Sequence, residues 1–146
     1  MCNKKNTIAI RVIAFLLVIV LVAPIGVSAS VQPRASDYLS LYSAYVYLPG
    51  DGEVRVYFNV QGTTTLDEIG ALSIKIYEST DGTNWTWKDT FMHDLTPGML
   101  AYNDWLHSGY VSYNGIAGRY YKAYVCIWGG KNGDGDTRYF YTSAKH

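Results

Sequence analysis

The sequence predicts an all-β protein, an antiparallel two-sheet sandwich of about seven strands, and three observations carry this prediction. From Asp37 onward apolar residues alternate with polar ones, as they do in strands that bury one face. Clusters of Gly, Asn and Asp interrupt the alternation at intervals of roughly 8–15 residues, as turns do in such folds. Only residues 99–107 show a trace of helical periodicity, over a stretch too short to indicate a helix.

The first 29 residues have the pattern of a cleaved signal peptide. Three basic residues and no acidic one precede an apolar run of 12 residues, Val12–Ala23. Pro24 then breaks the run, and small residues lead to Ala29, after which we expect cleavage and secretion. The alternative is a retained membrane anchor, which the sequence disfavours because a spanning helix needs about 20 apolar residues.

We expect a short linker over 30–36 and one β-sandwich domain over 37–146. The whole chain has 146 residues and balances 12 basic against 12 acidic residues, so removal of three basic residues leaves a net charge of −3. That balance excludes the strongly basic class of nucleic-acid binders. Of the two cysteines only Cys126 follows the signal segment, so stability must come from a hydrophobic core and not from an internal disulfide.

The first half of the domain reads as four strands. Val54, Val56, Phe58 and Val60 alternate with polar residues, which predicts a strand with one buried face. Turn residues 49–52 and Asp81-Gly82 indicate two hairpins. The four predicted strands are Tyr38–Leu48, Glu53–Val60, Leu72–Tyr77 and Trp85–Met92. Trp85, Trp87 and Phe91 fall two or four residues apart, so we expect all three in the core.

The second half supplies three further strands and two connections. We expect the strands at Tyr110–Tyr113, Arg119–Trp128 and Thr137–Ser143. The 93–107 connection is long for a sandwich, and such loops are often functional or hold a short helix. The Gly-rich segment 129–136 reads as a loop, because Gly, Asn and Asp supply the positive φ angles that turns require.

Two stretches resemble known families. Ser79-Thr80-Asp81-Gly82 with Trp85, and Gly118–Cys126 before a Gly-rich loop, resemble hairpins of fibronectin type III and immunoglobulin-like sandwiches. This resemblance implies that Tyr121, Ala123 and Val125 point inward. Asp37-Tyr38-Leu39, 66–74 and 124–128 look like a family of small exported proteins from anaerobic Firmicutes, which implies a free-standing small protein and no particular activity.

The strongest candidate site is an aromatic face on the predicted sheet. Residues of one parity on the strands near 72–78, 119–128 and 137–143 point outward if those strands are neighbours. The candidate ligand-binding residues are Tyr77, Tyr120, Lys122, Tyr124, Trp128, Tyr139 and Tyr141. Aromatic rings with polar tips stack on sugars or grip extended peptides. The alternatives are that the aromatic residues only stabilise the sheet as cross-strand pairs, or that the 93–107 connection covers them.

The remaining motifs give little evidence for a metal site or a catalytic site. Asn132, Asp134 and Asp136 begin like a calcium loop but lack the later Gly and Glu of that motif, so a plain turn is the better interpretation. Cys126 lies inside a strand, where a structural cysteine is the ordinary case. His93 with Asp94, and Asp104 with His107, could form hydrogen-bonded pairs without any catalytic motif around them. We therefore expect no enzyme activity, no cofactor and no metal.

These observations predict an exported, non-enzymatic binding or adhesion module whose ligand is a polysaccharide or a protein surface. Stacking on the aromatic face would supply affinity, with Lys75 and Lys122 orienting the ligand. We expect no nucleic-acid partner, and membrane contact only through the signal segment before cleavage. The alternatives are a small secreted toxin or bacteriocin-like effector, and a surface protein that self-assembles through exposed strand edges or Cys126. The sequence leaves the oligomeric state open.

Overall fold

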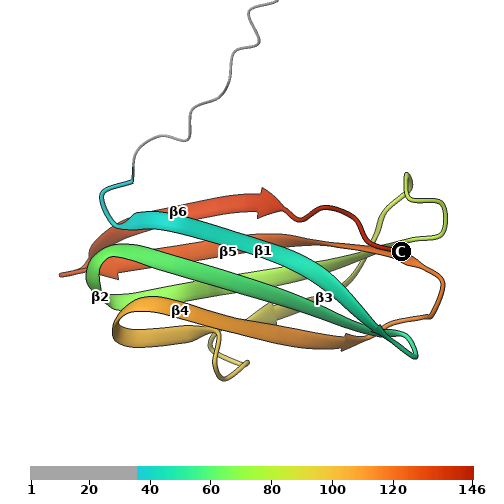
Figure 1. Cartoon of the computed structure of the whole chain (residues 1–146), viewed down its shortest axis with the longest axis horizontal. Helices are drawn as coiled ribbons and strands as arrows, with labels where there is room; N and C mark the ends of the chain where they lie inside the picture. The colour runs from blue at the N-terminus through green and yellow to red at the C-terminus, as the bar shows by residue number, and fades with distance from the viewer. Residues whose placement is uncertain (1–35) are drawn as a thin grey trace, which may run out of the picture. The chain divides into compact units, whose positions relative to one another are not determined.

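The computed structural model describes residues 36–146, which form one antiparallel sheet of six strands (Figure 1). The strands are β1 (Leu39–Gly50), β2 (Glu53–Ser79), β3 (Thr86–Met92), β4 (Leu100–Asn114), β5 (Tyr120–Lys131) and β6 (Asp134–Tyr141). The predicted signal peptide, and the linker apart from Ser36, lie outside the described residues. The all-β antiparallel class is confirmed, with six strands where the sequence predicts seven.

No helix in the described part of the chain is long and apolar enough to span a membrane.

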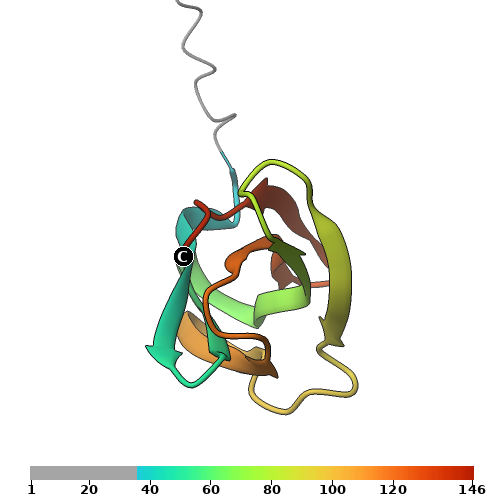
Figure 2. The ribbon, with the colours of Figure 1, turned by 90° about the vertical axis from the view of Figure 1, so that its right-hand side faces the viewer.

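Strand β2 runs through the whole sheet and changes partners near its middle. Its first half pairs with β1 and β4, and its second half pairs with β3 and β5. Strand β6 continues the sheet beyond β5. Viewed along the strands, the ribbon curls around a common interior that the side chains fill (Figure 2). One 27-residue strand thus belongs to both halves of the sheet.

The bend in β2 lies between Gln61 and Leu66. Over this stretch β2 advances five positions, whereas β4 advances only two, from Leu106 to Asp104. Extra residues on one strand bend it and increase its twist. Gly62 is needed at the bend, because a Cβ there would lie 2.7 Å from the Thr64 carbonyl oxygen and 2.9 Å from the Leu66 side chain.

A second irregularity in β2 changes which residues point inward. Ala71 pairs with Ile127 and Ser73 with Cys126, so Leu72 is an extra residue on β2. Before this bulge Ile69 and Ala71 are buried, and after it the inward positions are Ile74 and Ile76. Because the side-chain period of a strand is two, one inserted residue exchanges the two faces.

The core is continuous through both halves of the sheet. The alternating residues of the first half of β2, from Val54 to Val60, are buried as the sequence predicts. On β5 the buried inward residues include Tyr121, Ala123, Val125 and Ile127. The remaining core side chains are Leu39, Val46, Leu66, Ile69, Ala71, Ile74, Ile76, Met99 and Val111.

Three predicted boundaries are wrong. Residues 53–60 and 72–77 are not separate strands but parts of β2, which runs through Gly62 and Gly70 without ending. The predicted 93–107 connection is largely strand, since β4 begins at Leu100 and contains the short strand expected at 110–113. The Gly-rich segment 129–136 is also mostly strand, closed by the two-residue turn Asn132-Gly133, whose φ angles are both positive.

A buried polar network ties β5 to β2 beneath the sheet. The Tyr121 hydroxyl donates to the Glu78 carboxylate at 2.7 Å and accepts from the Ile116 amide at 2.6 Å. The Lys88 ammonium lies 3.2 Å from the other Glu78 oxygen. Burial opposes ionisation of Glu78, but the Tyr121 hydroxyl and Lys88 outweigh it and hold the pKa of this carboxyl below its ordinary value. Burial chiefly raises the pKa of Tyr121 to about 12.

Candidate binding face

The candidate aromatic residues come from three neighbouring strands. Strand β5 lies between the second half of β2 and β6, which is the neighbourhood that an aromatic face requires. Lys75 pairs with Tyr124, and Tyr124 pairs with Tyr141 across the next strand. Tyr77 pairs with Lys122 one step along. The registers therefore place these side chains in two adjacent outward rows.

Four tyrosines form one ring cluster. The Tyr124 ring centroid lies 4.7 Å from that of Tyr141 and 6.1 Å from that of Tyr139. The Tyr77 and Tyr141 centroids are 6.0 Å apart. Tyr139 and Tyr141 are 62% and 54% exposed, so the 93–107 segment does not cover them. We call this cluster, together with Lys75, Lys122 and Trp85, the β5 face.

Lys122 is held between two aromatic rings. Its ammonium lies 4.3 Å from the centroid of Trp85 and 4.8 Å from that of Tyr141. A cation over an aromatic face is attracted by the negative electrostatic potential of the ring. None of the ion pairs among residues 36–146 involves Lys75 or Lys122. The β5 face therefore combines clustered rings with two positive charges that have no acidic partner among residues 36–146.

Two of the sequence-predicted residues lie apart from this cluster. Tyr120 packs against His146, with ring centroids 4.2 Å apart. Trp128 lies at the other end of β5, where its Nε1 donates to Glu68 at 3.1 Å. Its ring covers Gly130 and Gly135, and a Cβ at either position would lie within 2.5 Å of the ring. Gly130 and Gly135 thus make room for Trp128.

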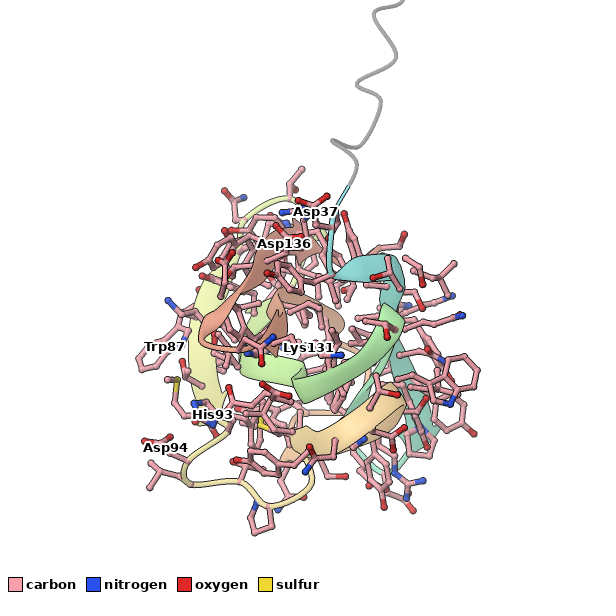
Figure 3. All side chains as sticks on the ribbon, turned by 90° about the vertical axis from the view of Figure 1, so that its left-hand side faces the viewer. Asp37, Trp87, His93, Asp94, Lys131 and Asp136 are labelled. Atoms are coloured by element: carbon pink, nitrogen blue, oxygen red, sulfur yellow. The ribbon has the colours of Figure 1, made fainter. Side chains whose placement is uncertain are left out.

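Trp85, which precedes β3, and Trp87, which lies in β3, do not fill the core, where the sequence predicts them. Trp87 is 57% exposed and projects away from the ribbon (Figure 3). Trp85 is half-buried against Lys122, and only Phe91 packs on the core. The reason is a bulge: Ile76 pairs with Asp89 and Tyr77 with Trp87, so Lys88 is an extra residue on β3. That insertion turns the tryptophans outward while Phe91 stays inward.

Cys126 belongs to the outward parity but is only 5% exposed. Burial raises the pKa of its thiol above its ordinary value, against smaller opposing effects of Tyr139 and Ser73. A buried, protonated thiol reacts poorly, because the thiolate is the nucleophile. This burial leaves little of the Cys126 side chain accessible to a second molecule.

Asp104 and His107, two of the residues considered for catalysis, each have a backbone partner. His107 Nε2 lies 2.9 Å from the Gly98 carbonyl oxygen. Asp104 accepts from the backbone amides of Trp105 and Leu106. His93 and Asp94 lie on the connection that follows β3 (Figure 3). The structure therefore gives Asp104 and His107 backbone partners in place of the pair considered from the sequence.

The acidic residues near β6 hold the start of the domain. Asp136 accepts from the Ser36 hydroxyl and from the Tyr38 amide, while the Tyr38 hydroxyl donates to Asp134 at 3.1 Å. Asp37 and Asp136 lie together where the chain enters the sheet (Figure 3). Within residues 36–146 no group of three or more His, Cys, Asp or Glu side chains could hold a metal ion.

A second tyrosine cluster lies on the first half of the sheet, and the sequence analysis misses it. It contains Tyr45, Tyr57 and Tyr110, from β1, β2 and β4. Tyr57 has the outward parity of its strand, which is a usable signal. The position of β4 beside β2 could not be predicted, because the sequence does not show which strand pairs with the predicted strand Tyr110–Tyr113.

Compared with known proteins, the chain matches no family model, no curated protein and no solved structure.

Proposed function

We propose that this chain is an exported, non-enzymatic binding module whose β5 face binds a polysaccharide. The observation that carries the proposal is the cluster of Tyr77, Tyr124, Tyr139 and Tyr141, with Lys122 held between Trp85 and Tyr141. Rings fixed on a paired sheet lose little conformational entropy when a ligand stacks on them. Their hydroxyl groups add hydrogen bonds at the rim.

The charges of the β5 face favour an acidic polysaccharide. Lys75 is exposed and lies beside Tyr124, so its ammonium is available to a carboxylate or sulfate on the ligand. A sugar ring stacked on Tyr141 would place its substituents close to Lys122. A protein surface is the second ligand class, since tyrosine-rich surfaces also recognise proteins.

The proposal also includes secretion and a relationship to known families. The charged, apolar and small-residue pattern of 1–29 supports secretion after cleavage at Ala29. The inward alternation of Tyr121, Ala123 and Val125 supports a fibronectin type III-like two-sheet sandwich, whereas the continuous β2 departs from that pattern. We also retain the proposed kinship with small exported proteins of Firmicutes.

The test is a titration of residues 30–146, which include every described strand, with acidic and neutral polysaccharides. Tryptophan fluorescence is a suitable signal because Trp85 contacts Lys122 at the face. We expect saturable binding that a Tyr124→Ala/Tyr141→Ala double variant loses.

The matched control is Tyr102→Ala, which removes from β4 a tyrosine that is 63% exposed, against 54% for Tyr141. Circular dichroism and thermal melting establish that each variant is folded. Wild-type affinity in the folded double variant contradicts the β5 face as the site. Absence of binding to every polysaccharide contradicts the sugar ligand, and a protein partner is then sought.

A further inference from the structure

The outward face of β1, the first half of β2 and β4 contains a shallow trough. The strand registers place its side chains in parallel rows that cross the three strands. One row is Tyr45, Tyr57 and Tyr110; the next is Ser43, Asn59 and Ser108; the third is Leu41, Gln61 and Leu106. Small polar residues thus lie between a row of rings and a row of longer side chains. We call this feature the β1 trough.

The tyrosine row forms a rigid wall. The Tyr45 and Tyr57 rings are nearly parallel, at 10°, with centroids 5.2 Å apart. Tyr57 and Tyr110 lie 5.1 Å apart at 32°. Tyr45 and Tyr110 are each 55% exposed, whereas Tyr57 is half-buried between them. The outer rings are therefore available to a ligand and are held in place by the central ring.

The floor of the trough carries small polar side chains. Tyr45, Tyr57, Asn59, Ser108 and Tyr110 line a depression of about 280 Å³, close to the lower end of ligand sites, at roughly 300 Å³. Asn59 Oδ1 is buried and is not accessible to a ligand in this structure. The polar groups that a ligand reaches here are the exposed Ser43 and Ser108 hydroxyl groups.

The trough is uncharged. None of the nine residues in its three rows carries a charge. The adjacent Arg55 is neutralised by Glu53, with Nε–Oε1 and Nη2–Oε2 distances of 2.7 and 3.0 Å, and its guanidinium lies over the Tyr110 ring. An acidic or basic polymer would lose hydration here without gaining a countercharge. The site therefore favours a neutral ligand rich in hydroxyl groups.

We propose that the β1 trough binds a neutral saccharide. The apolar C–H face of one sugar ring packs against the tyrosine wall, and the hydroxyl groups of the sugar hydrogen-bond to the exposed Ser43 and Ser108, which lie on either side of Asn59. An extended peptide fits less well, because the trough crosses three paired strands and offers no free strand edge at its centre. The proposal does not depend on the β5 face.

The experiment is a two-dimensional amide NMR titration of residues 30–146 with cellohexaose, xylohexaose, mannohexaose and chitohexaose, one at a time. Concentrations reach about 10 mM, above the millimolar Kd of a weak complex. At least one oligosaccharide should shift the amides of Asn59, Ser108, Gly109 and Tyr110 in a saturable way. If all four leave these amides unchanged, the proposal is overturned.

Variants separate the two faces. Tyr45→Ala/Tyr110→Ala and Ser43→Ala/Ser108→Ala should each weaken the binding of the shifted oligosaccharide by about tenfold or more. The matched control, Tyr124→Ala/Tyr141→Ala, should bind it as wild type does. Loss in the control with retention in the trough variants overturns the proposal, and so does equal affinity for a galacturonic acid hexamer. Failure of the β5 face in the polysaccharide titration leaves these outcomes unaffected.

Discussion

The two tyrosine clusters use the same residue type in different surroundings. On the β5 face the rings lie beside two lysines that have no acidic partner among the described residues. In the β1 trough the rings border uncharged Ser and Asn side chains, and the nearby Arg55 is paired with Glu53. Aromatic content alone therefore does not define a ligand. The neighbouring charges decide whether an acidic or a neutral chain is favoured.

The largest expected effect comes from a variant at the bend of β2, which connects the two faces. Gly62→Val places side-chain atoms against the Thr64 carbonyl and the Leu66 side chain, at the bend that joins both halves of β2. We expect a loss of about 3 kcal/mol in the free energy of unfolding, because overpacking forces the backbone to move. Urea denaturation measures it. Thr65→Ala, on an exposed neighbour in the bend, should cost far less, and equal losses would contradict the steric role of Gly62.

The next change acts beneath the β5 face. Tyr121→Phe leaves the Ile116 amide and one Glu78 oxygen without their partner, and we expect a loss of about 1–3 kcal/mol in stability. Tyr113→Phe is the control, because Tyr113 is a half-buried tyrosine that packs on Tyr121. Thermal melting of both variants should show the larger drop for Tyr121→Phe. A near-neutral Tyr121→Phe would show that the network adds no net stability.

Alkaline pH tests the same network without a mutation. The pKa of Tyr121 is about 12 in the folded protein against an ordinary value of 10.0. The unfolded chain therefore loses this proton first, so stability is fully present below pH 10 and falls as pH rises from 10 to 12. Urea denaturation across this range measures the slope, and Tyr121→Phe should flatten it. An identical slope in that variant would assign the loss to other tyrosines.

The variant with the smallest expected effect tests the difference in charge between the β5 face and the β1 trough. Lys122→Met keeps much of the side-chain bulk but removes the cation between Trp85 and Tyr141. Binding of an acidic polysaccharide to the β5 face should weaken about fivefold and lose part of its salt dependence. Neutral oligosaccharide binding in the β1 trough should not change. A parallel loss at both sites would indicate a structural effect of Lys122 in place of a direct one.

The sequence predicts best where the alternation is regular. The buried series from Val54 to Val60 and the inward series on β5 follow directly from period two. The alternation does not predict which side chains point inward around Gly62, Leu72 and Lys88, where strands bend or carry an extra residue. Glycine and threonine around the bend read as a break, although β2 continues through it. Bulges depend on the partner strand, and one sequence does not reveal its partners.

Prediction of the two candidate faces from the sequence is limited in the same way. The outward tyrosines of β5 and β6 could be predicted because both strands are regular and adjacent along the chain. The β1 trough needs Tyr110 of β4 beside Tyr57 of β2, a pairing between residues 53 positions apart. Local patterns do not encode that distance. Trp87 is misplaced for a related reason, since the bulge at Lys88 lies only one residue away.

The shared strand β2 also has a consequence for how the molecule gains and loses structure. Its first half meets β1 through a tight hairpin and its second half meets the neighbouring β3, but the second half also pairs with β5, which begins more than 40 residues further along the chain. Such non-local pairing raises the contact order and slows folding. Because both halves of the sheet contain part of β2, local opening of one half destabilises the other half. Amide hydrogen exchange along β2 should therefore proceed as a single cooperative unit, with similar protection before and after the bend.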